Sequence, residues 1–185
     1  MTKKTTILTA AALGAGIAIA PMAASAATIM KIGFATINDG QHKSAKWIAK
    51  EVMKRTNGSI DVKVYPAAQL GKIPRMIEGV LLGTIEGFIS PPGFFKGLNP
   101  AFAAPDAPGL FNSFAHQTKT MNHPSVRSKF LNLGTPKGVT GLYISAAGAS
   151  ALAMRDPVRK LADVKGKKIR VLASPIEVAI MRSLG

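Results

Sequence analysis

Residues 29–90 alternate strand-like and helix-like patterns, and this alternation constrains the fold more than any other feature. The apolar run 29–37 predicts a buried strand, and residues 59–66 alternate apolar and polar side chains with the period of a strand. A third strand is expected within residues 84–90, before two prolines. Successive strands separated by helices pair in parallel through right-handed crossovers, so the sequence predicts an α/β sheet.

Two amphipathic helices are expected between these strands. Residues 42–56 carry apolar side chains at helical spacing and end at Asn57-Gly58, a helix stop. Residues 73–82 show the same periodicity, with Pro74 in the first turn. The Pro- and Gly-rich stretch that follows is expected to be irregular. A helical stretch is expected over 113–134, interrupted near His123-Pro124, because proline disfavours helix in the residue before it. Three more strands are expected at residues 138–148, 150–158 and 167–174.

The N-terminus has the pattern of a secretory signal peptide. Lys3 and Lys4 precede an uncharged run that is too short to cross a bilayer, and an Ala-Ser-Ala sequence ends at Ala26. We expect residues 1–26 to be removed on export to the periplasm, and no stable membrane insertion of the mature chain. The absence of cysteine excludes a disulfide framework, thiolate metal sites and a cysteine nucleophile.

The chain is strongly basic, with 24 Lys and Arg against 9 Asp and Glu and a formal charge of +15. Such a charge favours nucleic acid, anionic membrane surfaces or small anions as partners. Export argues against nucleic acid, and the sequence contains no nucleic-acid-binding motif.

Catalytic signatures are absent from the sequence. His42, His116 and His123 lack metal-ligand spacing and are expected at surface or cap positions. The acidic residues are scattered, and no serine lies in a nucleophile-elbow motif. We therefore expect no enzyme activity, no cofactor and no metal.

Arg170 is the strongest candidate for a ligand contact. In the expected strand 167–174, Lys168 and Arg170 share one face, and a helix-like segment follows. Ligands of open α/β sheets bind at the carboxyl ends of strands, where an arginine can pair a carboxylate with two hydrogen bonds. A solvated basic surface is the alternative interpretation.

Several motifs, taken in order, resemble the solute-binding proteins of TRAP (tripartite ATP-independent periplasmic) transporters, the DctP-like family. They are "HKSAKWIAKEVMKRTNGSIDVKVYPAAQLG", "MIEGVLLGTIEGF", "PDAPGLF" and "DPVRKLADVKGKKIRVLASP". The resemblance implies two α/β domains joined by a hinge, capture of a small organic acid, transfer to a TRAP membrane permease, and a carboxylate clamp at Arg170. We expect α/β domain I at residues 27–144 and a partial α/β domain II at residues 145–185. Further candidate ligand contacts are Ser150, Ser174, Asn38, Gln41 and Ser90.

The sequence departs from the family pattern at two places. Family members commonly carry a second arginine soon after the glycine matching Gly148, where this chain has Ala149 and Ser150. They also continue beyond the position matching Gly185, so we expect a fragment or a truncated gene product. A periplasmic hydrolase on an α/β scaffold and a basic protein that adheres to anionic surfaces remain the alternative functions.

Overall fold

A three-stranded parallel sheet organises the N-terminal part of the chain. The structure, a computed structural model, describes residues 26–146, 148, 151–171 and 174–185. The strands are β1 (Thr28–Gly33), β2 (Ile60–Tyr65) and β3 (Gly87–Phe88), in the order β2-β1-β3. The α/β prediction is confirmed, although the third strand is much shorter than its predicted span.

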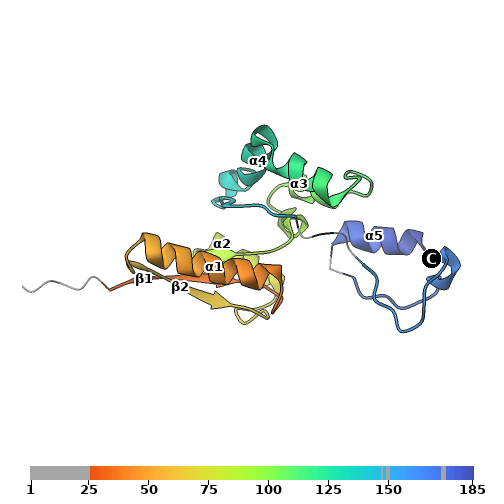
Figure 1. Ribbon diagram of the computed structural model, residues 1–185, viewed down its shortest axis with the longest axis horizontal. Coiled ribbons are helices and arrows are strands. Elements are labelled where there is room, and N and C mark those ends of the chain that lie inside the picture. The colour runs from red at the N-terminus through yellow and green to blue at the C-terminus, as the bar shows by residue number, and fades with distance from the viewer. Residues whose placement is uncertain (1–25, 147, 149–150, 172–173) are drawn as a thin grey trace, which may run out of the picture.

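Helices pack on both faces of this sheet. Helix α1 (Gly40–Arg55) lies on the face of Ile32, and its Ala45 is fully buried there with Val62 of β2. Helix α2 (Ile73–Leu81) packs its buried Met76 against Gly33, which faces the other side of the sheet, because neighbouring strand residues point in opposite directions. The two crossover helices therefore cover the strands as the alternating pattern predicts, and Figure 1 shows α1 and α2 beside β1 and β2.

A series of aromatic contacts connects the sheet to the middle of the chain. The rings of Phe88, Phe95, Phe102 and Phe130 contact one another in that order, with centroid distances of 5.8, 5.6 and 5.6 Å. They belong to β3, η1 (Pro92–Phe95), η2 (Pro100–Asp106) and α4 (Pro124–Leu131), respectively. Helix α3 (Phe114–Asn122) precedes α4, and the break between them at His123-Pro124 is where the sequence predicts it.

The C-terminal part contains short helices and no strand among its described residues. It holds η3 (Thr135–Lys137), η4 (Leu161–Asp163) and α5 (Pro175–Ser183), and Figure 1 shows α5 apart from the sheet. The strands predicted within 138–148, 150–158 and 167–174 are therefore wrong for the described residues of these segments. An extended segment becomes a strand only when another strand pairs with it, and the three strands described here pair only among themselves.

Tyr143 lies where the chain passes from α4 toward the C-terminal part. Its side chain is half-buried, and burial raises the pKa of Tyr143 although a hydrogen bond with the Ser44 side chain opposes that shift. Ser44 belongs to α1, so this contact places residue 143 beside the first turns of that helix.

Neither a membrane span nor a metal cluster occurs in the described part of the chain. None of its helices combines the length and hydrophobicity needed to cross a bilayer. Its His, Asp and Glu side chains form no group of three or more that would suit a metal ion. The predicted signal peptide, residues 1–26, lies outside the described residues except for Ala26.

Candidate ligand-binding site

The loop between β1 and α1 carries two of the predicted contacts, Asn38 and Gln41. Asn38 adopts a left-handed conformation with φ 59°, and its backbone N–H donates a hydrogen bond of 3.1 Å to Nδ1 of His42. The backbone N–H of His42 in turn donates to Oδ1 of Asp39, the N-cap of α1, at 3.1 Å. These two hydrogen bonds join His42 to Asn38 and to Asp39, and so they fix the loop that follows the carboxyl end of β1.

His42 is buried, with 8% of its surface exposed. Its ring packs against the fully buried Phe34 at a centroid distance of 5.5 Å. A surface position is therefore wrong for His42, but the cap position is confirmed, because the ring accepts the Asn38 N–H in the first turn of α1 while it packs on the core. The expectation is confirmed for His116, which is exposed, and for His123, the exposed N-cap of α4.

Hydrogen bonds inside the loop also orient its polar side chains. The Thr36 hydroxyl donates to Oε1 of Gln41 at 3.3 Å. Burial opposes ionisation of Asp39, but hydrogen bonds from the Thr36 side chain and from the backbone N–H of His42 outweigh it and lower the pKa of that carboxyl. Asp39 is therefore engaged in holding the loop, whereas the side chain of Asn38 is exposed.

Ser90, the third predicted contact, follows β3 at the same edge of the sheet. The backbone N–H of Ile89 donates to the Gly33 carbonyl at 3.0 Å, so the chain still runs beside β1 as it approaches Ser90. The Ser90 Oγ is buried and has no hydrogen-bond partner among the described residues. Buried hydroxyls in native proteins almost always have a partner, so the Ser90 hydroxyl is a candidate for contact with a ligand or a water molecule.

The loop after β2 is tied to the loop after β1. The backbone N–H groups of Ala67 and Ala68 donate to the carbonyls of Thr36 and Phe34, at 2.9 and 3.0 Å. Both alanines are left-handed, with φ 52° and 57°. Two consecutive non-glycine residues in this conformation store strain, which proteins concentrate at functional sites. The sequence gives no signal for this feature, because alanine rarely adopts the left-handed conformation, although both alanines lie within the motif "YPAAQLG".

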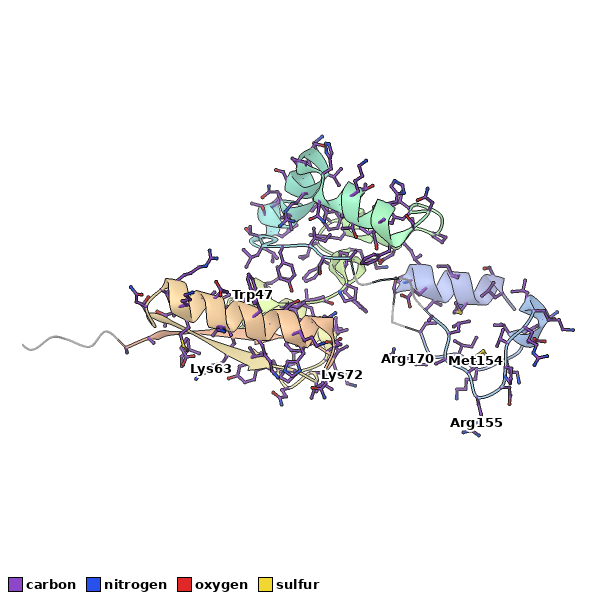
Figure 2. The ribbon with its side chains drawn as sticks, in the orientation of Figure 1. Trp47, Lys63, Lys72, Met154, Arg155 and Arg170 are labelled. Atoms are coloured by element: carbon purple, nitrogen blue, oxygen red, sulfur yellow. The ribbon has the colours of Figure 1, made fainter. Side chains whose placement is uncertain are left out.

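The remaining predicted contacts lie in the C-terminal part. Arg170 is exposed, and Figure 2 shows it on the segment near α5, apart from the three strands. No hydrogen bond or ion pair involves its guanidinium within the described residues. Ser174 is the buried N-cap residue of α5, and Ser150 lies outside the described residues. The structure thus gathers Asn38, Gln41 and Ser90 at one sheet edge and places Arg170 and Ser174 elsewhere.

A separate apolar cavity lies between η2, α3 and α4. Its volume is about 340 Å³, and mainly apolar side chains line it, among them Leu110, Met121 and Phe130, together with His116. His116 Nδ1 accepts a hydrogen bond of 3.4 Å from the Asn112 backbone, and His123 pairs with Ser125 Oγ at 2.8 Å. No carboxylate is hydrogen-bonded to either ring in the described part of the chain.

Comparison with known proteins matches most of the chain to one family. The DctP profile, described as bacterial extracellular solute-binding protein, family 7, matches residues 33–185. The 2,3-diketo-L-gulonate-binding periplasmic protein YiaO of Escherichia coli K12 is 34% identical over 173 residues, which are 92% of this chain and 52% of that protein. The C4-dicarboxylate-binding periplasmic protein DctP of Rhodobacter capsulatus is 29% identical over 71% of this chain and 40% of its own length.

Solved structures give the same result. A TRAP periplasmic solute-binding protein from Xanthobacter autotrophicus Py2, with bound β-D-galacturonate, matches with a TM-score of 0.78 and 33% identity. The match covers 84% of this chain and 52% of that one. The chain therefore spans about half the length of these two relatives, the Escherichia coli protein and the Xanthobacter autotrophicus protein.

Proposed function

The chain belongs to the DctP family, bacterial extracellular solute-binding protein family 7, and we propose from this membership that it captures a small organic acid for a TRAP-type membrane permease. The observation that carries the proposal is the match over residues 33–185, which includes both the loops at the carboxyl edge of the sheet and Arg170. Family members are binding proteins, which supports a role without chemistry.

The ligand class follows from what the relatives are named for. Diketogulonate, C4-dicarboxylates and galacturonate are all carboxylates. A carboxylate needs a charged donor and further polar groups that fix its orientation. We assign the charged donor to Arg170, whose guanidinium has no ion pair with any described residue.

The carboxyl edge of the sheet supplies the neutral polar contacts that complement Arg170 in this proposal. The unpartnered hydroxyl of Ser90 and the exposed amide of Asn38 offer neutral hydrogen bonds beside the fixed loop, and Gln41 orients Thr36 next to them. Ser150 and Ser174 are proposed as further contacts. Ligand would then be bound between residues 27–144, the first domain, and residues 145–185, part of a second domain.

The same proposal includes export. Residues 1–26 act as a signal peptide and the protein works in the periplasm, as the names of its relatives in Escherichia coli and Rhodobacter capsulatus imply for those proteins.

A thermal-shift screen tests the ligand class. The protein is purified from the cells that naturally produce it. It is then heated with galacturonate, malate or gluconate, and with galactose as the uncharged control. A ligand that binds only the folded state stabilises it by about 2.7 kcal/mol at a hundred times its dissociation constant. We expect at least one acid, and not galactose, to raise the melting temperature. Failure of every acid in a broad carboxylate panel would refute the proposal.

A further inference from the structure

The solvent face of α1 combines four lysines with the single tryptophan of the chain. Lys43, Lys46, Lys50 and Lys54 recur at three- and four-residue spacing and are all exposed, as is Trp47 among them. The opposite side of the helix carries Ala45, Ile48, Ala49 and Val52, which pack on the sheet. We call the four lysines and Trp47 the α1 surface.

Trp47 is unusual in this setting because 61% of its surface is exposed. Figure 2 shows it on α1, and its indole N–H has no hydrogen bond with any residue that the structure describes. A large apolar ring with a free polar N–H is the side-chain type that concentrates where membrane hydrocarbon meets the headgroups. The ring is thus equipped for an environment that is apolar on one side and polar on the other.

The lysines around Trp47 have no counter-charges of their own. The ion pairs of the described residues join Lys31 to Glu86, Arg55 to Glu51, Lys63 to Asp61 and Lys167 to Asp156, and none includes a lysine of the α1 surface. Glu51 is the one acidic residue of α1, and Arg55 pairs with it. The α1 surface is therefore a concentrated, uncompensated positive patch.

We propose that the α1 surface docks on an anionic phospholipid bilayer, with Trp47 at headgroup depth and the lysines on the phosphates. Because the apolar side of α1 packs on the sheet, this docking depends on the attraction of the lysines to the phosphates and on the preference of tryptophan for headgroup depth. Each lysine close to an anionic surface contributes about 1 kcal/mol, or roughly a fivefold gain in binding.

A lipid surface suits this patch better than an acidic protein does. A protein partner would have to immobilise several long, unpaired lysine side chains, and that costs conformational entropy for each of them. Lipid headgroups are mobile, so the lysines keep their freedom while their ammonium groups remain near the phosphates. Binding at this surface is independent of the carboxylate site, and its test does not depend on that proposal.

Binding to lipid vesicles tests this docking, with protein purified from the cells that naturally produce it. The vesicles contain phosphatidylcholine alone or an equimolar mixture with phosphatidylglycerol, and bound protein is measured by sedimentation. Because Trp47 is the only tryptophan, its fluorescence reports directly on the α1 surface. We expect binding and a blue shift with the mixed vesicles only, both reversed by high salt, since salt screens surface charge.

Two quadruple variants with equal charge change separate this surface from general basicity. Lys43→Gln, Lys46→Gln, Lys50→Gln and Lys54→Gln together should weaken binding more than about tenfold. The control changes the exposed Lys96, Lys119, Lys129 and Lys137 to Gln and should stay within about twofold, because these lysines lie off the α1 surface. Trp47→Ala should also weaken binding to the mixed vesicles.

Three outcomes would overturn the inference. They are binding without a blue shift of Trp47, equal losses in the two quadruple variants, and a blue shift with polyglutamate but none with vesicles. The last outcome would assign the α1 surface to an acidic protein instead.

Discussion

The backbone N–H of Asn38 donates a 3.1 Å hydrogen bond to Nδ1 of His42, four residues later. The same arrangement recurs in α3, where the Asn112 N–H donates to Nδ1 of His116 at 3.4 Å. In both places the residue after the asparagine caps the helix through its side chain, at the histidine N–H. The pairs differ in burial, because His42 lies in the core and His116 is exposed.

This difference predicts unequal effects of one substitution. His42→Leu keeps an apolar group in the core but leaves the Asn38 N–H without its acceptor, and an unsatisfied, partly buried donor costs about 1–3 kcal/mol. His116→Leu, the matched control, should change the free energy of unfolding by less than about 0.5 kcal/mol because it is at the surface. Urea denaturation of both variants measures the two values. Equal losses of unfolding free energy in the two variants would show that burial of His42 adds nothing to the value of its hydrogen bond.

Asp39 should make stability depend on acid. Its pKa is lowered in the folded state, so its contribution is present above the unfolded-state pKa and disappears as pH falls through the lower folded-state value. Asp39→Ala removes the N-cap and should cost about 1 kcal/mol at neutral pH. Asp39→Asn keeps a capping oxygen and should retain most of the stability while losing the pH dependence. Unfolding curves at neutral and acidic pH distinguish the two variants.

Asp106 should give the unfolding free energy the opposite pH dependence. Burial first, and then the negative charge of Glu177, raise the pKa of the Asp106 carboxyl. A raised folded-state pKa gives stability that is complete below the unfolded-state pKa and is lost as pH rises through the folded-state value. Asp106→Asn should therefore stabilise the protein at neutral pH, by at most about 1 kcal/mol after solvent screening, and the gain should vanish in acid.

The control for Asp106 is Glu78→Gln at an exposed position of α2. Glu78→Gln should change the free energy of unfolding at neutral pH by less than about 0.5 kcal/mol, as expected of a surface substitution. A destabilised Asp106→Asn variant at neutral pH would contradict the assigned cause.

Ala67 offers a gain in stability. Its left-handed φ of 52° disfavours any residue with a Cβ, by about 1–2 kcal/mol. Glycine removes that strain but adds entropy to the unfolded chain, which offsets about 0.5–1 kcal/mol. Ala67→Gly should thus raise the free energy of unfolding by up to about 1.5 kcal/mol, whereas Ala115→Gly in α3 should lower it. Thermal unfolding of both variants is the measurement, and a loss in Ala67→Gly would refute the strain.

Arg170 should differ from its basic neighbours in ligand binding. If it clamps a carboxylate, Arg170→Ala should weaken binding by about 2–5 kcal/mol, or more than tenfold. Arg170→Lys should fail similarly, since an ammonium cannot form the two parallel hydrogen bonds of a guanidinium. Lys167→Ala and Lys168→Ala are the controls. If calorimetry gives the same ligand affinity for all four variants, residues 167–171 form only a solvated basic surface.

Local patterns predicted the sheet and its helices well. The apolar residues of α1 recur every three or four positions, and Pro124 ends α3, so both features follow from neighbours in the sequence. The sequence predicts the position of His42 near a helix cap but not its burial. Asp39 and Asn38 precede it at capping distance, but Asn112 and Ser113 precede His116 in the same way, and only tertiary packing buries one ring and exposes the other.

The segment around Arg170 shows where local reasoning fails. Residues 168–171 alternate charged and apolar side chains as a strand does, yet no described strand pairs with them. Pairing depends on a partner elsewhere in the chain, which alternation cannot supply. The unpartnered Ser90 hydroxyl was likewise invisible to sequence, because an absent hydrogen bond is a property of the folded surroundings.

The phenylalanine series has a consequence for the order of folding. Two of its contacts join residues only seven positions apart, Phe88 with Phe95 and Phe95 with Phe102, and the third joins Phe102 to the more distant Phe130. The strand pairs are complete earlier still, at Phe88. Contacts of short sequence separation close quickly because little loop entropy opposes them. A chain that emerges N-terminus first therefore meets every partner of the sheet and of the series before residue 131 appears, and its later residues meet a preformed surface.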